Sequence, residues 1–146
     1  MNIIKSLLFV FFISLSSTLK ANVLVISDID DTLKISHVLD ADKALLNALD
    51  TESAFFGLNE IFRELKTQYG NQIEFVYLTN APDKLMRLSH EEFLLRHQFP
   101  AGQLLMPRKA FDFLNFKKVQ ITQILNKKSY DKIIFFGDNG EADVQV

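Results

Sequence analysis

The sequence contains no cysteine, which excludes a disulfide, a zinc–thiolate site and a thiol nucleophile and leaves the redox compartment undecided. The formal net charge is only −2, so the composition does not indicate nucleic-acid binding by a basic face. Only 23% of the residues are charged and 48% are hydrophobic, which is typical of a folded globular chain. We find no internal repeat, low-complexity tract or Pro/Gly/Ser-rich linker. The 146 residues therefore indicate one domain.

The first 21 residues have the order of a secretory signal peptide. Met1 to Lys5 carries a positive charge, Ser6 to Leu15 is a nearly unbroken apolar stretch, and Ser16 to Ala21 is mostly small or polar. The apolar stretch is well short of the roughly 20 residues needed to span a bilayer. We therefore expect cleavage after Ala21 and export to the periplasm or the exterior, with residues 22–146 as the mature domain. The alternatives are an uncleaved membrane anchor and a buried core segment.

The most informative stretch is residues 23–32, an apolar run that ends in Asp28, Asp30, Asp31 and Thr32. An apolar, β-branched run bounded by polar residues predicts a buried strand with the carboxylates at its C-terminal end. In open α/β sheets, ligands bind at that edge. Three carboxylates within four residues repel one another unless a cation neutralises them. The stretch therefore predicts a divalent metal and chemistry at the strand tip.

Helix and strand patterns alternate along the rest of the chain. Further strands are predicted over 73–78, 104–106 and 133–136, and helices over 41–50, 58–69, 82–97 and 116–125. The apolar positions that define the last three helices are Leu58, Ile61, Phe62 and Leu65; Leu85, Leu88, Phe93 and Leu94; and Val119, Ile121, Ile124 and Leu125. This alternation implies an α/β fold with a doubly wound parallel sheet. A doubly wound sheet normally continues with another helix and strand after the fourth of these strands, and the sequence stops at residue 146. We therefore expect the fourth strand to form an exposed edge.

Asp28 and Asp30 are the candidate catalytic carboxylates. A carboxylate can attack an electrophilic phosphorus and form an aspartyl-phosphate, which divides one difficult displacement into two easier ones. We assign this nucleophilic role to Asp28. Asp30 can protonate the leaving oxygen and later deprotonate the attacking water. We expect Thr32 to steady the loop by hydrogen bonding, and Asp31 to be a solvated or turn-stabilising acid.

Thr79 and Asn80 are the candidate phosphate-binding residues, because they lie between a predicted strand and the helix that follows it. Backbone N–H groups and the helix dipole favour a bound anion at such a place. The alternative for Thr79 is a helix cap, since Thr-Asn before Pro82 is common capping chemistry. Without the other candidate residues, we would interpret Thr79 as a helix cap.

The start of the helix over 116–125 can supply a cation. Lys117 and Lys118 both qualify to neutralise charge on a transferring phosphoryl group, and to bind it. Each would otherwise be an ordinary solvated helix lysine. The residues alone leave the choice between them open.

Two further carboxylates, Asp138 and Asp143, follow the last predicted strand. Together with Asp28 and Asp30 they would complete an oxygen-ligand site for Mg²⁺, which prefers one or two carboxylates together with water and phosphate oxygen. Read alone, the Gly-Asp-Asn-Gly sequence at 137–140 is simply a turn.

These residues resemble, in their order, the four motifs of the haloacid dehalogenase superfamily. A closer resemblance is to the catalytic domain of the actin-patch-type phosphatidate phosphatase family, and it covers residues 22 to 146. It rests on four motifs: Ser27-Asp-Ile-Asp-Asp-Thr32, Thr79-Asn-Ala-Pro82, Phe99-Pro-Ala-Gly-Gln-Leu-Leu105 and Gly137-Asp-Asn-Gly-Glu-Ala-Asp143. The family usually has serine at the position of Thr79, and its domain continues beyond residue 146.

The resemblance implies a Rossmannoid three-layer core with a minimal cap, truncated at its C-terminus. It implies Asp28 as the nucleophile, Asp30 as the acid/base and Thr79 as a phosphate ligand. It favours Lys117 over Lys118, because the spacing of Lys117 to Ile121 and Leu125 is similar to that in the family's helix. It also implies that Asp138 holds Mg²⁺ and that Asp143 ligates or supports it.

The segment from Leu33 to Phe56 lies where this superfamily inserts substrate-selecting flaps. The segment is short, so we expect an open site, which suits a bulky or membrane-borne phosphate ester. The remaining polar candidates are interpreted as structural or surface residues: His37, His90, His97, Arg108 and Lys109.

The sequence thus predicts an exported, Mg²⁺-dependent phosphomonoester phosphatase. The resemblance implies phosphatidate as the substrate, with possible contact at a membrane surface and no nucleic-acid partner. One alternative is a general acid phosphatase for small molecules. The other is a catalytically inactive remnant that binds metal or phosphate. Oligomeric state is left open.

Overall fold

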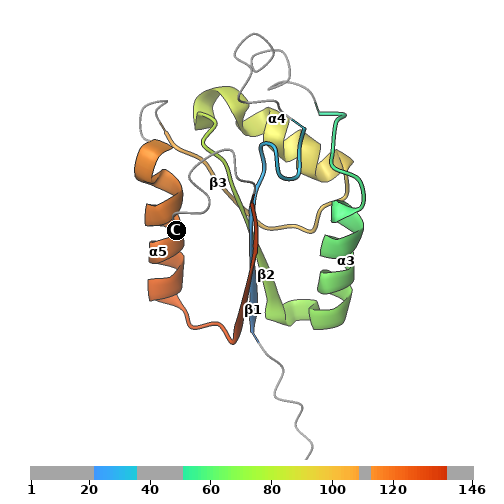
Figure 1. Ribbon diagram of the computed structural model, residues 1–146, viewed down its shortest axis with the longest axis vertical. Helices are drawn as coiled ribbons and strands as arrows, with labels where there is room; N and C mark the ends of the chain where they lie inside the picture. The colour runs from blue at the N-terminus through green and yellow to red at the C-terminus, as the bar shows by residue number, and fades with distance from the viewer. Residues whose placement is uncertain (1–21, 36–50, 109–112, 138–146) are drawn as a thin grey trace, which may run out of the picture.

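The computed structural model describes residues 22–35, 51–108 and 113–137, which form three layers (Figure 1). The middle layer is a parallel sheet of β1 (Val23–Asp28), β2 (Ile73–Leu78), β3 (Gln103–Leu105) and β4 (Lys132–Phe136), in the order β3-β2-β1-β4. Helices α3 (Leu58–Tyr69) and α4 (Asp83–Arg96) lie on one side, and α5 (Phe113–Lys127) lies on the other. A short 3-10 helix, η1 (Gly70–Gln72), leads from α3 into β2. The predicted α/β class and three-layer core are confirmed.

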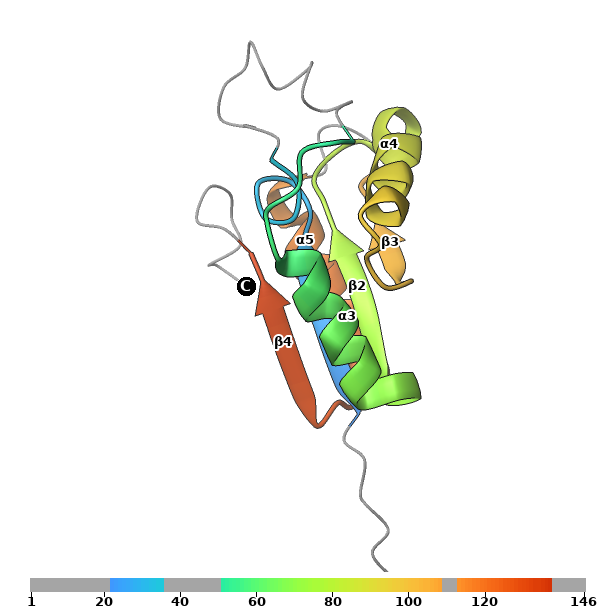
Figure 2. The same cartoon turned by 90° about the vertical axis from the view of Figure 1, so that its right-hand side faces the viewer.

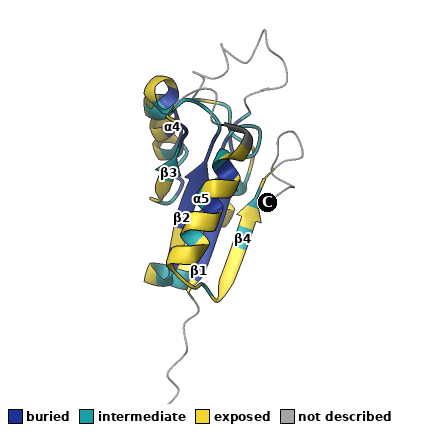
Figure 3. Cartoon of the chain, turned by 90° about the vertical axis from the view of Figure 1, so that its left-hand side faces the viewer, coloured by how far each residue is buried: buried dark blue, intermediate teal, exposed yellow. Residues whose placement is uncertain are grey.

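Strand β1 is buried along its whole length because both of its faces are covered (Figure 3). Val23 and Val25 face the core on the α3 and α4 side, and Leu24 and Ile26 face the core on the α5 side. This explains why β1 reads as a continuous apolar run rather than an alternating one. The aspartates that follow β1 therefore begin at the end of the most deeply buried element of the sheet.

Several of the phenylalanine side chains pack together on the α3 side of the sheet. The ring of Phe62 lies 4.7 Å from Phe136, 5.4 Å from Phe99 and 5.7 Å from Phe75, measured between centroids. Packed aromatic rings bury large areas and prefer such offset and edge-on arrangements. These ring contacts join α3 to β2 and β4. Helix α3 lies in front of the sheet in Figure 2.

Most predicted elements agree with the structure to within a few residues. Strand β2 has the predicted bounds, α3 begins after Gly57 and is followed by Gly70, and β3 begins one residue early. The backbone φ angles of Gly57 and Gly70 are +85° and +59°, values that glycine adopts more easily than other residues. The helix predicted over 41–50 lies outside the described residues.

Of the four apolar positions that defined the predicted helix over 82–97, Phe93 and Leu94 pack in the core of the fold and the other two do not. Leu85 and Leu88 are 76% and 81% exposed, whereas Met86, His90 and Phe93 are buried. The helix carries apolar residues on two faces, so the spacing of leucines alone could not show which face meets the sheet. Outside α4, three other residues that defined predicted helices are also substantially exposed: Ile61, Val119 and Leu125.

Strand β3 approaches β2 closely because of one glycine. A Cβ atom on Gly102 would lie 2.5 Å from the carbonyl oxygen of Phe75 and 2.8 Å from the ring of Tyr77. The hydroxyl of Tyr77 donates to the carbonyl of Pro100 at 2.7 Å, and burial raises the pKa of this tyrosine above its ordinary value of 10.0. The Phe-Pro-Ala-Gly motif thus forms the connection that sets β3 beside β2.

Strand β4 lies at the edge of the sheet formed by the described residues, next to β1. Its first two side chains are exposed, the next three alternate between half-buried and exposed, and Phe135 is 54% exposed. The fourth strand therefore has the edge position that was expected for it.

Candidate active site

The loop after β1 is a tight turn anchored by two buried apolar side chains. The N–H of Ile29 donates to the carbonyl of Leu78, which extends the pairing of β1 with β2 by one residue. The carbonyl of Ile29 then accepts from the N–H groups of Thr32, Leu33 and Lys34. Ile29 and Leu33 are both fully buried in the core. Because these apolar residues point inward, the loop is held firmly at the sheet edge.

Asp31 adopts a backbone φ of +55°, a left-handed conformation that aspartate tolerates better than most residues. Its N–H donates to the carbonyl of Lys34 at 2.8 Å. This conformation agrees with the interpretation of Asp31 as a turn residue rather than a reacting group.

The two described ends of the predicted flap lie side by side next to this loop. The N–H of Ile35 donates to Ser53, and the N–H of Phe55 donates to Leu33, both at 3.0 Å. Lys34 and Ala54 form an isolated antiparallel β-bridge between the same two segments. The chain therefore enters and leaves the predicted flap through two segments, 33–35 and 53–55, that are hydrogen-bonded to each other. Residues 36–50, including His37, lie outside the described residues.

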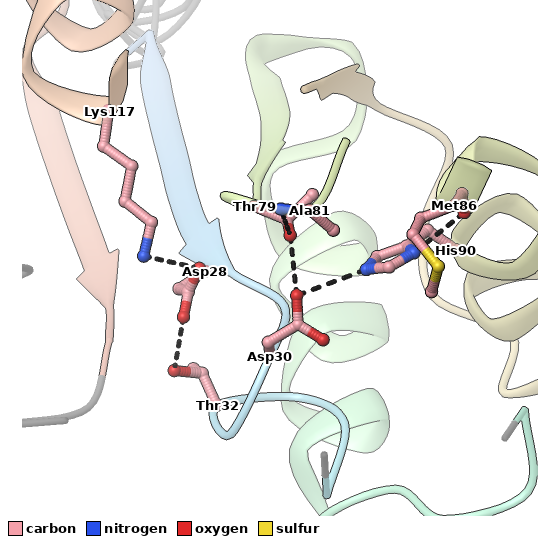
Figure 4. Close-up of polar contacts among 8 residues, drawn as sticks. All are labelled: Asp28, Asp30, Thr32, Thr79, Ala81, Met86, His90 and Lys117. Atoms are coloured by element: carbon pink, nitrogen blue, oxygen red, sulfur yellow. Dashed lines mark hydrogen bonds and ion pairs between the residues drawn. The ribbon is translucent and has the colours of Figure 1, made fainter. Parts of the chain in front are cut away.

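Asp28 forms a buried ion pair with Lys117 at the C-terminal end of β1. The Nζ of Lys117 lies 2.9 Å from Oδ1 of Asp28, and the two residues are only 7% and 5% exposed. The hydroxyl of Thr32 makes a longer contact with Oδ2 of Asp28, at 3.5 Å (Figure 4). A close cation favours the ionised form of a buried carboxylate, which is the form that can act as a nucleophile.

The position of Lys117 follows from the packing of α5. Ile121, one helical turn later, is buried against Leu24 and Ile26 of β1, with Ile124 packed beside it. Residues four apart share a helix face, so Lys117 points to the same side and reaches Asp28. Lys118 is exposed. The structure brings Lys117, not Lys118, to the predicted nucleophile.

Asp30 lies on the other side of the loop and contacts Thr79. The hydroxyl of Thr79 donates to Oδ2 of Asp30 at 2.6 Å and accepts from the N–H of Ala81 at 2.9 Å. Thr79 is fully buried. The N-cap residue of α4 is Pro82, and no described side chain makes a cap hydrogen bond there. The helix-cap interpretation of Thr79 is therefore wrong, and its side chain instead joins the β2 end to the aspartate loop.

His90 is the residue that the sequence interpretation missed. Its Nε2 lies 3.3 Å from Oδ2 of Asp30, its Nδ1 lies 2.9 Å from the carbonyl oxygen of Met86, and the side chain is fully buried (Figure 4). The available signal was the spacing of Met86, His90 and Phe93, which places all three on one helix face. His97, by contrast, contacts the carbonyl of Thr51 at 2.8 Å, in keeping with a structural role.

The remaining predicted site residues are only partly described. Asn80 follows Thr79 at the C-terminal end of β2 and is half-buried, and Arg108 is exposed. Asp138, Asp143 and Lys109 lie outside the described residues. Gly137 is the last described residue, directly after the strand that pairs with β1.

Asp28 and Asp30 supply the hard oxygen donors that suit Mg²⁺, which takes one or two carboxylates together with water and substrate oxygen. In the part of the chain that the structure describes, no group of three or more His, Cys, Asp or Glu residues is placed to hold a metal ion. The donor set at the β1 end therefore fits Mg²⁺ in its chemistry, and the further predicted ligands come from outside the described residues.

The strand order explains how this site is assembled. Strand β1 is central, so the lysine of α5 and the threonine after β2 reach its two aspartates from opposite sides. This is the arrangement that the resemblance to the haloacid dehalogenase superfamily implies. The family described as "Phosphatidate phosphatase APP1, catalytic domain" matches residues 23–146, and the chain belongs to that family.

Solved structures show the same fold at low sequence identity. A class C acid phosphatase from Bacillus anthracis, solved with tungstate bound, aligns with a TM-score of 0.59 and 14% identity over 92% of this chain. A chain of the Pnkp1/Rnl/Hen1 RNA repair complex aligns with a TM-score of 0.54 and 18% identity over 79% of this chain. The chain spans 59% and 34% of those two proteins, respectively. No similar sequence was found among curated proteins.

Proposed function

We propose that this protein hydrolyses phosphomonoesters by transferring the phosphoryl group first to Asp28 and then to water. The observation that carries the proposal is the buried pair of Asp28 and Lys117 at the end of β1, two residues before Asp30. A carboxylate kept ionised beside a fixed cation is suited to attack phosphorus, and the cation neutralises charge that develops on the phosphoryl oxygens.

The chemistry proceeds in two displacements. An oxygen of Asp28 forms a bond to phosphorus while the bond to the leaving oxygen breaks, and Asp30 gives its proton to that leaving oxygen. Asp30 then takes a proton from water, the water oxygen bonds to phosphorus, and phosphate departs to regenerate the Asp28 carboxylate. Placement of Asp30 on the same loop as Asp28 supports both proton transfers.

Thr79 and Asn80 are proposed to contact the phosphate. In the structure the single hydroxyl proton of Thr79 is donated to Asp30, so contact with a phosphate oxygen requires the hydroxyl to exchange that partner. Mg²⁺ is proposed as the cofactor, held by Asp28, Asp30, Asp138 and Asp143. When bound, it would neutralise charge on the transferring phosphoryl group.

The proposed substrate is phosphatidate, on the basis of the family to which the chain belongs. A pocket of about 450 Å³ beside the aspartate loop is lined largely by aromatic rings, including Phe55, Phe56 and Phe135. An apolar surface next to the phosphoryl site suits an ester that carries acyl chains. The alternative substrate class is a small soluble phosphomonoester, and a catalytically inactive phosphate-binding domain is the alternative from another class.

Export through residues 1–21 remains part of the proposal. Among the described residues, no helix is both long and apolar enough to cross a membrane.

A direct assay tests the function. We expect the purified protein to release phosphate from phosphatidate in mixed micelles when Mg²⁺ is present, and EDTA to abolish the release. Under the same conditions p-nitrophenyl phosphate should be hydrolysed with a lower kcat/KM. A higher kcat/KM for the soluble ester would favour the general acid phosphatase. Release no faster than that of the Asp28→Asn variant would contradict any enzymatic function.

The acid role of Asp30 predicts a dependence on the leaving group. The alkoxide released from phosphatidate needs a proton, whereas p-nitrophenolate leaves without one. We therefore expect Asp30→Asn to lower kcat for phosphatidate by about 10²- to 10⁴-fold, and to slow the first, phosphoryl-transfer step of p-nitrophenyl phosphate hydrolysis much less. Single-turnover measurement of p-nitrophenolate release isolates that first step. Equal losses in the first step for both substrates would rule out leaving-group protonation by Asp30.

A further inference from the structure

The contact between α4 and the aspartate loop carries an inference that deepens, and rests on, the proposed phosphatase function. His90 is fully buried, and its Nε2 lies 3.3 Å from Oδ2 of Asp30. A buried imidazole is costly unless its polar atoms have partners. His90 has a partner at each ring nitrogen, and one of them is the proposed acid/base.

The ring is held in one orientation by its own helix. The carbonyl of Met86 can only accept a hydrogen bond, so the Nδ1 that faces it at 2.9 Å carries a proton, and Nε2 is directed to Asp30. Helix α4 is in turn fixed by Phe93, which is fully buried and packs 5.9 Å from Phe99 between ring centroids. His90 is therefore mounted on a packed element rather than on a loop.

Asp30 is held from two sides at a single oxygen. Thr79 donates to Oδ2 from the end of β2, and His90 meets the same oxygen from α4 (Figure 4). Because both contacts end on Oδ2, the carboxyl group cannot turn about its last bond without losing them. The two partners come from different elements, so they also define how far the aspartate loop lies from β2 and α4.

We propose that His90 is a positioning residue that sets the orientation of the Asp30 carboxyl group for proton transfer. It acts through Asp30 and does not itself touch the substrate. Misplacing a catalytic group by about 1 Å can cost on the order of a hundredfold in rate, so loss of this contact should be visible in kcat.

Two substitutions separate the contacts of the ring. In His90→Asn the amide can still meet the carbonyl of Met86 but is too short for Asp30, and in His90→Gln the longer side chain can place an N–H near Asp30. For phosphatidate we expect His90→Asn to lower kcat by about ten- to a hundredfold with little change in KM, and His90→Gln to recover most of the loss. For p-nitrophenyl phosphate, both variants should retain the wild-type rate of the first, phosphoryl-transfer step to within a few-fold.

The double variant Asp30→Asn/His90→Asn provides the decisive comparison. If His90 acts through Asp30, the double variant should be no slower than Asp30→Asn alone, whereas independent effects would multiply. His97→Asn is the matched control, because it alters a partly buried histidine at the end of the same helix, which contacts the carbonyl of Thr51, and it should affect both substrates equally. Far-ultraviolet circular dichroism and urea unfolding verify that each variant is folded.

The outcomes separate this inference from the proposed function. An inactive wild-type protein would contradict the function itself. If the wild type is active, three results would overturn the positioning role alone. They are an unchanged kcat in His90→Asn, an equal slowing of the first step for both substrates, and a rate loss in the double variant equal to the product of the two single losses.

Discussion

Replacing Asp28 with asparagine should reduce phosphate release by more than about a thousandfold, because the substitution removes the nucleophile on which both displacements depend. The variant should lose stability, because it breaks the buried ion pair with Lys117 from one side, but it should still fold, since asparagine has nearly the same shape and its amide oxygen can accept from the lysine. KM for any residual activity should change little. Steady-state kinetics with phosphatidate and p-nitrophenyl phosphate measure the loss for both leaving groups.

Asp31→Asn is the matched control for this loss. It makes the same chemical change three residues later, at a turn residue whose positive φ asparagine also tolerates. We expect this variant to keep activity to within about tenfold. Rapid acid quenching followed by peptide mass spectrometry should find phosphate attached to Asp28 in the wild type. A labelled peptide that carries phosphate at another residue, or equal losses in the two variants, would contradict the assignment.

Removing the cation of the buried pair should affect both stability and activity. Lys117→Met leaves the Asp28 carboxylate buried at about 5% exposure without the charge that lies 2.9 Å away. Breaking a buried ion pair from one side typically costs about 3–5 kcal/mol. We expect a loss of that order in the free energy of unfolding, measured by urea denaturation in EDTA so that no divalent cation replaces the lost charge. The rate of phosphate release should fall by about a hundredfold or more.

The double variant Asp28→Asn/Lys117→Met should recover much of that stability, because it no longer buries the carboxylate charge that Lys117 neutralises. Lys118→Met, which alters an exposed neighbour, should change the free energy of unfolding by no more than about 0.5 kcal/mol. A destabilisation by Lys118→Met as large as that by Lys117→Met would mean that the loss comes from helix α5 in general. A double variant as unstable as Lys117→Met would mean that the buried charge is not its cause.

The helices, the strands and the aspartate loop could be predicted from local sequence patterns. Helix α3 carries an apolar periodicity of helical type with glycines at both ends, and β2 is a short apolar run rich in β-branched and aromatic residues. Asp28 and Asp30 were recognisable because acidic residues at the end of a buried strand are costly unless a site uses them. The buried face of α4 could not be predicted from the sequence, because one face of the helix carries Leu85 and Leu88 and another carries Met86 and Phe93.

By itself, the sequence determined the α/β class, the placement of the two aspartates at a strand end and the family to which the chain belongs. Only the tertiary structure decided between Lys117 and Lys118, excluded the helix-cap role of Thr79 and connected His90 to Asp30. The physical reason is sequence separation. Asp30 meets Thr79 and His90 across 49 and 60 positions, and such contacts exist only after the sheet and its helices have packed.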